Sequence, residues 1–249
     1  MHQLISLPIA KQNCRTCSHT HQCLPREFSG DERERFFRTA VRCSRVVKRG
    51  EHLFRLGQRF CSLYIVRSGS VKLYSLDDAE EQVLGFYLTG DLFGFDAIAT
   101  GYHECAALAL ETSSICELGF AGLEDLSTSM HLLQKQMSAW YGREIARDFA
   151  LLRLLGKKSA EQRLAIFLLD LSQRLSARGF SAHEFNLSMS RQDIGSYLGL
   201  ALETVSRLFA RLQEDGVITV DRRHITLLDE TRLRELAGDC MTALRRHNC

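Results

Sequence analysis

Apolar side chains recur at spacings of three and four between Met130 and Leu155, which predicts one face of a long helix. A stripe this long and narrow is typical of a helix that pairs with a second copy of itself. Asp148 falls on the stripe, where its carboxylate would face its symmetry mate and weaken the pair. An ordinary core helix with Asp148 turned to solvent is the alternative. The predicted homodimer contact comprises Met137, Tyr141, Ile145, Asp148, Leu152 and Leu155.

Short β-prone runs separated by glycines occupy residues 43–118. This texture predicts a compact antiparallel barrel or roll of about a hundred residues. A short helix that starts at Asp31 is expected before it, over residues 31–40. The predicted strands are Glu51–Leu56, Ser62–Ser68, Ser70–Leu76, Gln82–Leu88, Ala106–Leu110 and Ser114–Leu118.

The run Ser159-Ala-Glu-Gln162 has the pattern of a capping box and starts a second helix, which should end near Gly179. Residues 192–208 then have the spacing of a helix-turn-helix. Gly195 is small where two helices cross, and Gly199 allows a left-handed turn that a side chain would resist. The apolar positions expected between these helices are Ile194, Leu198, Leu200, Val205 and Leu208.

Two short strands at 217–220 and 224–227, joined by Asp221-Arg-Arg223, add a hairpin and make the motif a winged helix that binds double-stranded DNA. Its second helix, Leu202–Glu214, should enter the major groove. There Arg207 can bond guanine through two parallel donors and Glu203 can accept from a cytosine amino group. A small helical hairpin within an enzyme is the alternative. The predicted DNA-binding residues are Glu203, Thr204, Ser206 and Arg207, with Arg191, Arg211, Arg222 and Arg223 as candidate phosphate contacts.

Length and composition fit a two-domain globular protein, with 249 residues and a hydrophobic content of 45%. The net charge of +2 leaves the partner open, because a DNA reader can be basic on one face only. Nine cysteines without a secretory leader indicate a reducing cytoplasm, and no run approaches membrane-spanning length. We expect no enzyme, because no nucleophile–base pair, phosphate loop or carboxylate dyad stands at a recognisable spacing.

Cys14, Cys17 and Cys23 form a C-x2-C-x5-C cluster on a polar arm over residues 1–30. Three thiolates so close in a short segment can hold one soft metal centre, and an iron–sulfur cluster needs a fourth ligand. Zinc with His19 or His21 as the fourth ligand is one alternative, and unliganded thiols are another.

Arm, roll, long helix and winged helix together resemble the CRP/FNR superfamily of bacterial transcription regulators, and most closely its oxygen-responsive FNR/ANR branch. The specific marks are the cysteine arm, Gly90-Asp-Leu-Phe-Gly-Phe-Asp-Ala97, Leu110-Glu-Thr-Ser-Ser-Ile-Cys-Glu117 and Glu203-Thr-Val-Ser-Arg207. The resemblance implies an α+β fold with an N-terminal antiparallel β-roll of the cyclic-nucleotide-binding kind. We expect the arm over 1–30, the roll over 31–126, a dimerisation helix over 127–157 and a winged-helix DNA-binding domain over 158–249.

The same resemblance implies an oxygen-labile [4Fe-4S] cluster held by Cys14, Cys17, Cys23 and Cys116. An intact cluster would favour a DNA-binding homodimer, and oxygen would release monomers, which suits anaerobic gene control. Glu203, Ser206 and Arg207 would then read inverted TTGAT-type half-sites. The acidic turn Asp77–Glu81 lies where relatives contact RNA polymerase.

Several alternatives to this reading exist. A cyclic nucleotide is not expected, because its phosphate needs a cation and Gly90–Ala109 contains no arginine or lysine. A haem sensor could use His52 or His103. A zinc-stabilised or thiol-redox-responsive regulator would need no iron–sulfur cluster.

Among the remaining cysteines, Cys105 is near enough in sequence to compete with Cys116 as fourth ligand, although the run around Cys116 fits the family better. The others, expected to be buried or inert thiols, are Cys43, Cys61, Cys240 and Cys249.

A mechanism follows from this arrangement as a hypothesis. Tying the arm to the roll at Cys116 would change how the roll packs on the long helix. Asp148 would keep the dimer equilibrium finely balanced, because paired carboxylates repel and resist losing water. Dimerisation would space two recognition helices one DNA turn apart.

Overall fold

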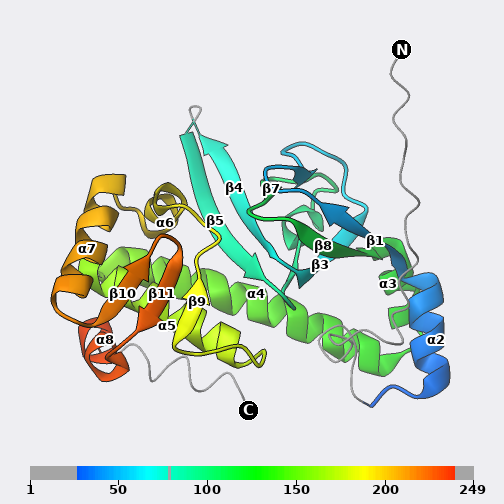
Figure 1. Ribbon diagram of the computed structural model, residues 1–249. Helices are drawn as coiled ribbons and strands as arrows, with labels where there is room; N and C mark the ends of the chain where they lie inside the picture. Colours follow the sequence, from blue (N-terminus) through cyan, green and yellow to red (C-terminus); the bar gives the residue numbers. More distant parts are fainter. Residues whose placement is uncertain (1–26, 78–79, 239–249) are drawn as a thin grey trace. The chain divides into compact units, whose positions relative to one another are not determined.

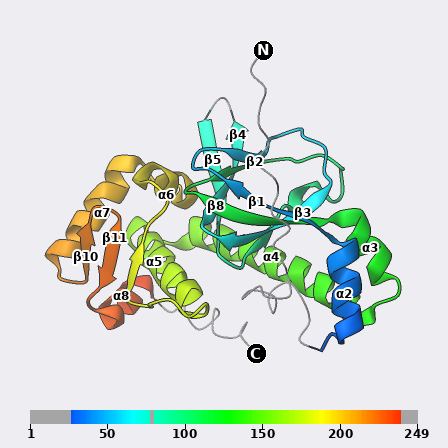
Figure 2. The same ribbon diagram turned by 45° about the vertical axis from the view of Figure 1, so that its right-hand side comes forward.

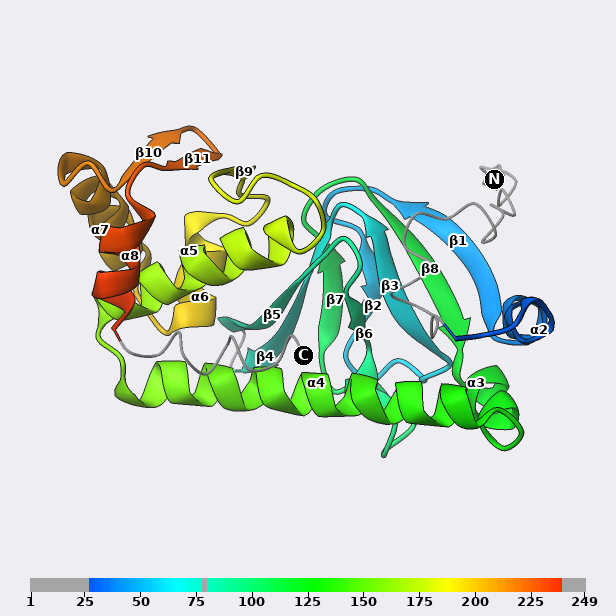
Figure 3. The same cartoon turned by 90° about the horizontal axis from the view of Figure 1, so that it is seen from below.

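The computed structural model describes residues 27–77 and 80–238. They form two compact units. The first unit comprises two segments, the chain up to Glu80 and Leu84–Ile145. The second unit comprises Glu81–Val83 and the chain from Ala146 onward. The predicted long helix is confirmed as α4 (His131–Lys157), which contributes residues to both units and is uninterrupted (Figure 3). No helix within the described ranges is long and apolar enough to cross a membrane.

The first unit is built around a β-roll of two four-stranded sheets, as predicted (Figure 1). The six predicted strands are all present, with small shifts at their ends. Two further strands, β1 and β6, were not predicted. Buried and exposed positions do not alternate regularly along β1, and β6 has only two residues. One sheet has the order β1 (Val41–Val47), β8 (Ser113–Gly119), β3 (Ser62–Ser68) and β6 (Leu92–Phe93). The other has the order β2 (His52–Phe54), β7 (Ala106–Ala109), β4 (Ser70–Asp77) and β5 (Glu80–Leu88).

Two hydrophobic clusters stabilise this unit. The inner cluster draws on both sheets and fills the roll; its large members include Phe54, Tyr64, Phe93 and Ile115. The outer cluster covers the other face of the β1–β8–β3 sheet with residues from three helices. Its members include Phe28, Phe36, Leu63, Leu123, Leu133, Met137 and Trp140. Side chains on alternate positions of β3 and β8 therefore enter different cores.

The helices of the outer cluster are α2 (Gly30–Thr39), α3 (Phe120–Ser127) and the first half of α4. Helix α2 begins one residue before the predicted Asp31, because Ser29 caps it and forms a capping box with Glu32. Helices α2 and α3 lie side by side (Figure 2). They approach closely at Gly122, where a Cβ atom would lie 2.4 Å from the Thr39 carbonyl oxygen.

The second unit is the predicted winged helix. Ser159 and Gln162 form the predicted capping box, although the helix that they start ends at Ser176, before Gly179. The recognition helix has the predicted bounds. Strand β9 and helix α8 were not predicted. The elements are α5 (Ala160–Ser176), β9 (Glu184–Asn186), α6 (Arg191–Leu198), α7 (Leu202–Glu214), β10 (Ile218–Asp221), β11 (His224–Leu227) and α8 (Glu230–Ala237), with the sheet order β10–β11–β9.

Candidate DNA interface and cysteine site

The turn of the helix-turn-helix depends on two glycines, as the sequence predicts. Gly199 has a φ of +62°, the left-handed conformation that ends α6. A Cβ atom on Gly195 would lie 2.5 Å from the Leu200 carbonyl oxygen. At the other end, Ser190 caps α6 and forms a capping box with Asp193. These contacts set how α7 leaves the turn.

Helix α7 has two distinct faces. Val205, Phe209 and Leu212 are buried, whereas the predicted core residues Leu200 and Leu208 are only partly so. On the opposite face Glu203, Ser206 and Arg207 are exposed at helical spacing, and Thr204 is half-buried. The three side chains predicted to meet base edges therefore share one solvent-facing surface.

The contacts within this triplet are weak and exchangeable. The Arg207 guanidinium lies 3.8 Å from the Glu203 carboxylate, and their side chains are 84% and 83% exposed. An ion pair so exposed stabilises a helix by well under about 1 kcal/mol. The Ser206 hydroxyl donates to the Leu202 carbonyl at 2.9 Å. Both charged groups can therefore turn to a DNA base at little cost.

The arginines that are candidate phosphate contacts differ in their exposure and in how many contacts they make within the protein. Arg222 and Arg223 are exposed at the wing turn, where Arg222 has a φ of +55°. Arg211 lies 3.7 Å from Glu161 and 3.8 Å from Asp215, and its side chain remains 62% exposed. Arg191 instead stacks over the Phe209 ring at 3.1 Å, and burial lowers its pKa to about 10. Arg191 thus also holds the helix pair together.

Arg163 is a structural contact that the sequence did not reveal. Its Nη1 donates to the Leu198 carbonyl at 2.9 Å, and its Nη2 donates to the Leu155 carbonyl at 2.8 Å. Its Nε donates to the Lys158 carbonyl at 2.9 Å. One guanidinium therefore joins the last turn of α4 to the end of α6. A single arginine in an amphipathic helix carries no signal of such a role.

The predicted dimer stripe on α4 divides by burial. Met137 is buried in the outer cluster and Tyr141 packs against it, so both belong to the core of one protomer. Farther along, Ile145 and Leu152 are 54% and 64% exposed, Asp148 is exposed and Leu155 is half-buried. Phe149, which was not predicted, is 58% exposed. The face open to a second copy is therefore centred on Ile145, Phe149 and Leu152.

The two competing cysteines of the roll face different clusters. Cys116 is half-buried on β8 and packs against the outer cluster. Cys105 belongs to the inner cluster, where its thiol donates to Asp96 at 3.3 Å. Burial, and after it the Asp96 charge, raises the pKa of the Cys105 thiol far above its ordinary value. Because thiolates bind metals, this environment disfavours Cys105 as a ligand.

Cys43 is a further thiol near Cys116. It lies on β1, and its neighbour Ser44 pairs with Cys116 on β8. Burial, and after it Glu117, raises the pKa of Cys43, which disfavours the thiolate form that binds metals. Cys14, Cys17, Cys23, Cys240 and Cys249 lie outside the described residues. Among residues 27–77 and 80–238, no group of three or more His, Cys, Asp or Glu could hold a metal ion.

Both histidines considered for haem have partners inside the roll. His52 Nε2 lies 2.8 Å from the Tyr74 hydroxyl. His103 is buried with its Nδ1 3.2 Å from Asp96, and its ring stacks on Phe54 with centroids 3.6 Å apart. One face of the His103 imidazole is thus covered by an aromatic ring.

Comparison with known families agrees with both units. Residues 162–236 match the Crp-like helix-turn-helix domain, and residues 44–129 match the cyclic nucleotide-binding domain. The fumarate nitrate reduction regulatory protein of Klebsiella oxytoca is 44% identical over 227 residues, which cover 91% of this chain and 90% of that protein. The chain belongs to the CRP/FNR superfamily. It is a DNA-binding transcription regulator, and this superfamily is not an enzyme class.

Two further comparisons support the assignment of this CRP/FNR regulator. The fumarate and nitrate reduction regulatory protein of Escherichia coli (strain K12) is 43% identical, with the same shares of both chains covered. Among solved structures, FixK2 from Bradyrhizobium japonicum is similar with a TM-score of 0.73 and 30% identity, covering 80% of this chain and 98% of that one. The α+β architecture predicted from the sequence is therefore confirmed.

Proposed function

We propose that this regulator controls anaerobic genes through a [4Fe-4S] cluster held by Cys14, Cys17, Cys23 and Cys116. The observation that carries the proposal is the place of Cys116. Of the two candidate fourth ligands, only Cys116 packs against the outer hydrophobic cluster. Phe28, the first buried residue described after the arm cysteines, lies in that same hydrophobic cluster. Relatives at 43–44% identity are named for the regulation of fumarate and nitrate reduction, which supports the anaerobic role.

The arm can reach Cys116. Phe28, which follows the arm, is buried in the outer cluster against which Cys116 packs. Cys23 is five residues before Phe28 in the sequence. Five residues span at most about 18 Å when fully extended, so a thiol at position 23 is within reach of the outer cluster. The half-buried Cys116 thiol therefore fits as the fourth ligand. The bound cluster would supply a tether that oxygen can break.

The outer cluster also connects this site to the dimer helix. Leu133, Met137 and Trp140 of α4 are buried in it together with Phe28. Ordering the arm at Cys116 would therefore act on side chains that pack α4 against the roll. We infer that this packing sets how well the exposed face of α4 pairs with a second copy.

The proposed DNA target is an inverted repeat of TTGAT-like half-sites, read by Glu203, Ser206 and Arg207 of each protomer. Contact with RNA polymerase through the acidic turn is a further part of the proposal. Glu80 and Glu81 of that turn are exposed, and residues 78–79 lie outside the described residues. Because bacterial promoters are its target, we place the regulator in the cytoplasm.

Metal analysis combined with DNA binding tests the proposal. Protein purified without air should contain iron and acid-labile sulfide, bind half-site DNA as a dimer, and lose both properties on exposure to air. A zinc-stabilised regulator would contain zinc and bind DNA equally in air. Full operator binding by air-free protein that lacks iron and sulfide would rule out the proposed sensor.

A further inference from the structure

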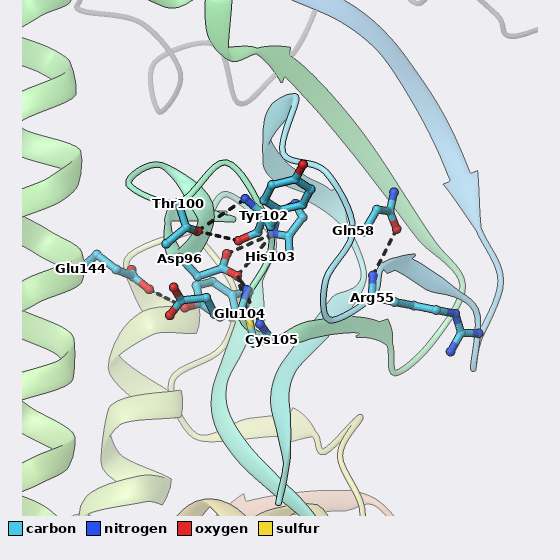
Figure 4. Close-up of polar contacts among 10 residues, drawn as sticks. Arg55, Gln58, Asp96, Thr100, Tyr102, His103, Glu104, Cys105 and Glu144 are labelled. Carbon is cyan, nitrogen blue, oxygen red and sulfur yellow. Dashed lines mark hydrogen bonds and ion pairs between the residues drawn. The ribbon is translucent and has the colours of Figure 1, made fainter.

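Three successive residues surround one carboxylate inside the roll (Figure 4). Asp96 lies on the short helix η2 (Phe95–Ala97). Its Oδ2 accepts from the backbone N–H of Glu104 at 2.9 Å, from the N–H of Cys105 at 3.3 Å and from the Cys105 thiol at 3.3 Å. His103 Nδ1 lies 3.2 Å from its Oδ1. Successive N–H groups that converge on one point form a nest that binds anions.

The surroundings make this nest a rigid part of the roll. The His103 side chain is 1% exposed and that of Asp96 is 18% exposed. His103 stacks on Phe54, and its backbone N–H and carbonyl bond the loop at Gln58 and Gly57. Burial alone would raise the pKa of Asp96, but the hydrogen bond and charge of His103, with the other donors, hold that pKa below its ordinary value.

The charge of the loop is opposite to what an external anion needs. The unit matches the cyclic nucleotide-binding domain, yet Gly90–Ala109 contains no arginine or lysine and supplies Asp96 instead. We propose that Asp96 is an internal ligand of an anion-binding nest formed by His103, Glu104 and Cys105. The nest is closed in the native protein with no small molecule bound. When the carboxylate is removed, an oxyanion such as phosphate takes its place.

The closed nest also fixes a contact with the long helix. Phe95, next to Asp96, packs edge-on against Tyr141 of α4, with ring centroids 5.7 Å apart. An internal carboxylate thus holds this turn against α4 at all times.

Thermal unfolding of the full chain with and without inorganic phosphate tests the proposal. Asp96→Ala should lower Tm by about 5 °C or more, because several hydrogen bonds to a buried carboxylate are lost. Phosphate should raise the Tm of Asp96→Ala clearly more than that of the wild type, in which only the general stabilising effect of this anion acts. Glu104→Gln is the matched control, since it removes a negative charge from the same loop and keeps the backbone donor. An equal response to phosphate in all three proteins, or a wild-type Tm for Asp96→Ala, would overturn it.

A second readout applies if Asp96→Ala does not fold. Asp96→Asn keeps the shape of the side chain but places an N–H₂ donor among donors. Its Cys105 should react with iodoacetamide about tenfold faster or more than in the wild type, where Cys105 is buried and donates to Asp96. Peptide mass spectrometry resolves Cys105 from the other thiols. Wild-type protection of Cys105 in Asp96→Asn would contradict the proposal that these donors require an anionic ligand.

Discussion

Glu203 and Arg207, the side chains proposed to contact DNA bases, are held only weakly by the rest of the protein. Each is more than four-fifths exposed, and each has the other as a weak partner across one helical turn. An exposed pair of this kind keeps both side chains near the solvent-facing surface of α7. It releases them at a cost below about 1 kcal/mol.

Replacing Arg207 by alanine should relax discrimination at one guanine of the half-site. The expected loss is about 1–3 kcal/mol on the preferred sequence and much less on a sequence with that guanine changed. Anisotropy titrations with the two DNA duplexes measure the difference. Arg211→Ala is the matched control, because a phosphate contact should weaken binding to both duplexes alike. A uniform loss with Arg207→Ala would make Arg207 a phosphate contact as well.

The four cysteines of the roll allow a comparison among single thiols. Cys116→Ser should abolish reconstitution of the cluster without air, measured by its visible absorbance, iron and sulfide. Cys105→Ser and Cys43→Ser should reconstitute normally, because burial and neighbouring carboxylates raise the pKa of both thiols. Loss of the cluster in Cys105→Ser with retention in Cys116→Ser would exchange their roles.

At the scale of elements, the DNA-binding domain is organised by contacts that end helices. Gly199 ends α6, and Arg163 donates to carbonyls at the ends of α4 and α6. Carbonyls at helix ends lack partners within their own helix, so a guanidinium with several donors satisfies them well. We regard Arg163 as a positioning residue for the recognition helix.

Arg163→Leu should destabilise the domain and weaken binding to DNA. Removing the donors to three carbonyls should lower the free energy of unfolding by about 1–3 kcal/mol or more. Urea unfolding measures that loss, and operator titration at temperatures where the variant is folded measures the effect on affinity. Arg163→Lys should recover only part of both, since an ammonium lacks the planar fork. Arg232→Leu, at an exposed position on α8, is the control and should leave both nearly unchanged.

At the scale of the whole molecule, the central question is how strongly two copies pair. Ile145, Phe149 and Leu152 are each more than half exposed on one face of α4, and exposed apolar side chains in a row favour association. Asp148 lies among them. Desolvation raises the pKa of Asp148, while Arg147 opposes the shift. The stripe thus combines an apolar attraction with a carboxylate that resists burial.

Asp148→Ala should produce a dimer that persists in air and binds operator DNA. Moving the monomer–dimer equilibrium from 1:99 to 99:1 takes about 5.5 kcal/mol. Removing the two facing carboxylates needs to supply only part of this free energy for a dimer to be present in air. Pairing would bury Asp148 further and raise its pKa in the dimer above its pKa in the monomer, so the wild-type dimer should strengthen as pH falls toward that pKa. The Asp148→Ala dimer should not respond.

Sedimentation in air at several pH values measures both effects. Asp125→Ala removes an exposed carboxylate from α3 and should leave the wild-type behaviour unchanged. A variant at Asp148 that still requires anaerobic cluster assembly to dimerise would show that the carboxylate does not set the balance.

The sequence by itself determined the elements whose signals are local. Gly195, Gly199 and the capping box at Ser159 and Gln162 act within a few residues, so the spacing alone predicted the winged helix and the start of α5. The glycine-separated runs predicted six of the eight strands of the roll for the same reason. The bounds of α7 follow from an apolar periodicity that extends over the whole helix.

Only the tertiary structure decided which face each side chain occupies. The stripe on α4 looked continuous, but Met137 is buried in the outer cluster and Phe149 is exposed, because the roll covers only the first part of the helix. Cys105 lies in the inner hydrophobic cluster, whereas Cys116 packs against the outer one. The fold of the loop after Asp96 brings the backbone donors of Glu104 and Cys105 to its carboxylate. Such contacts join residues distant in the chain, and periodicity carries no information about them.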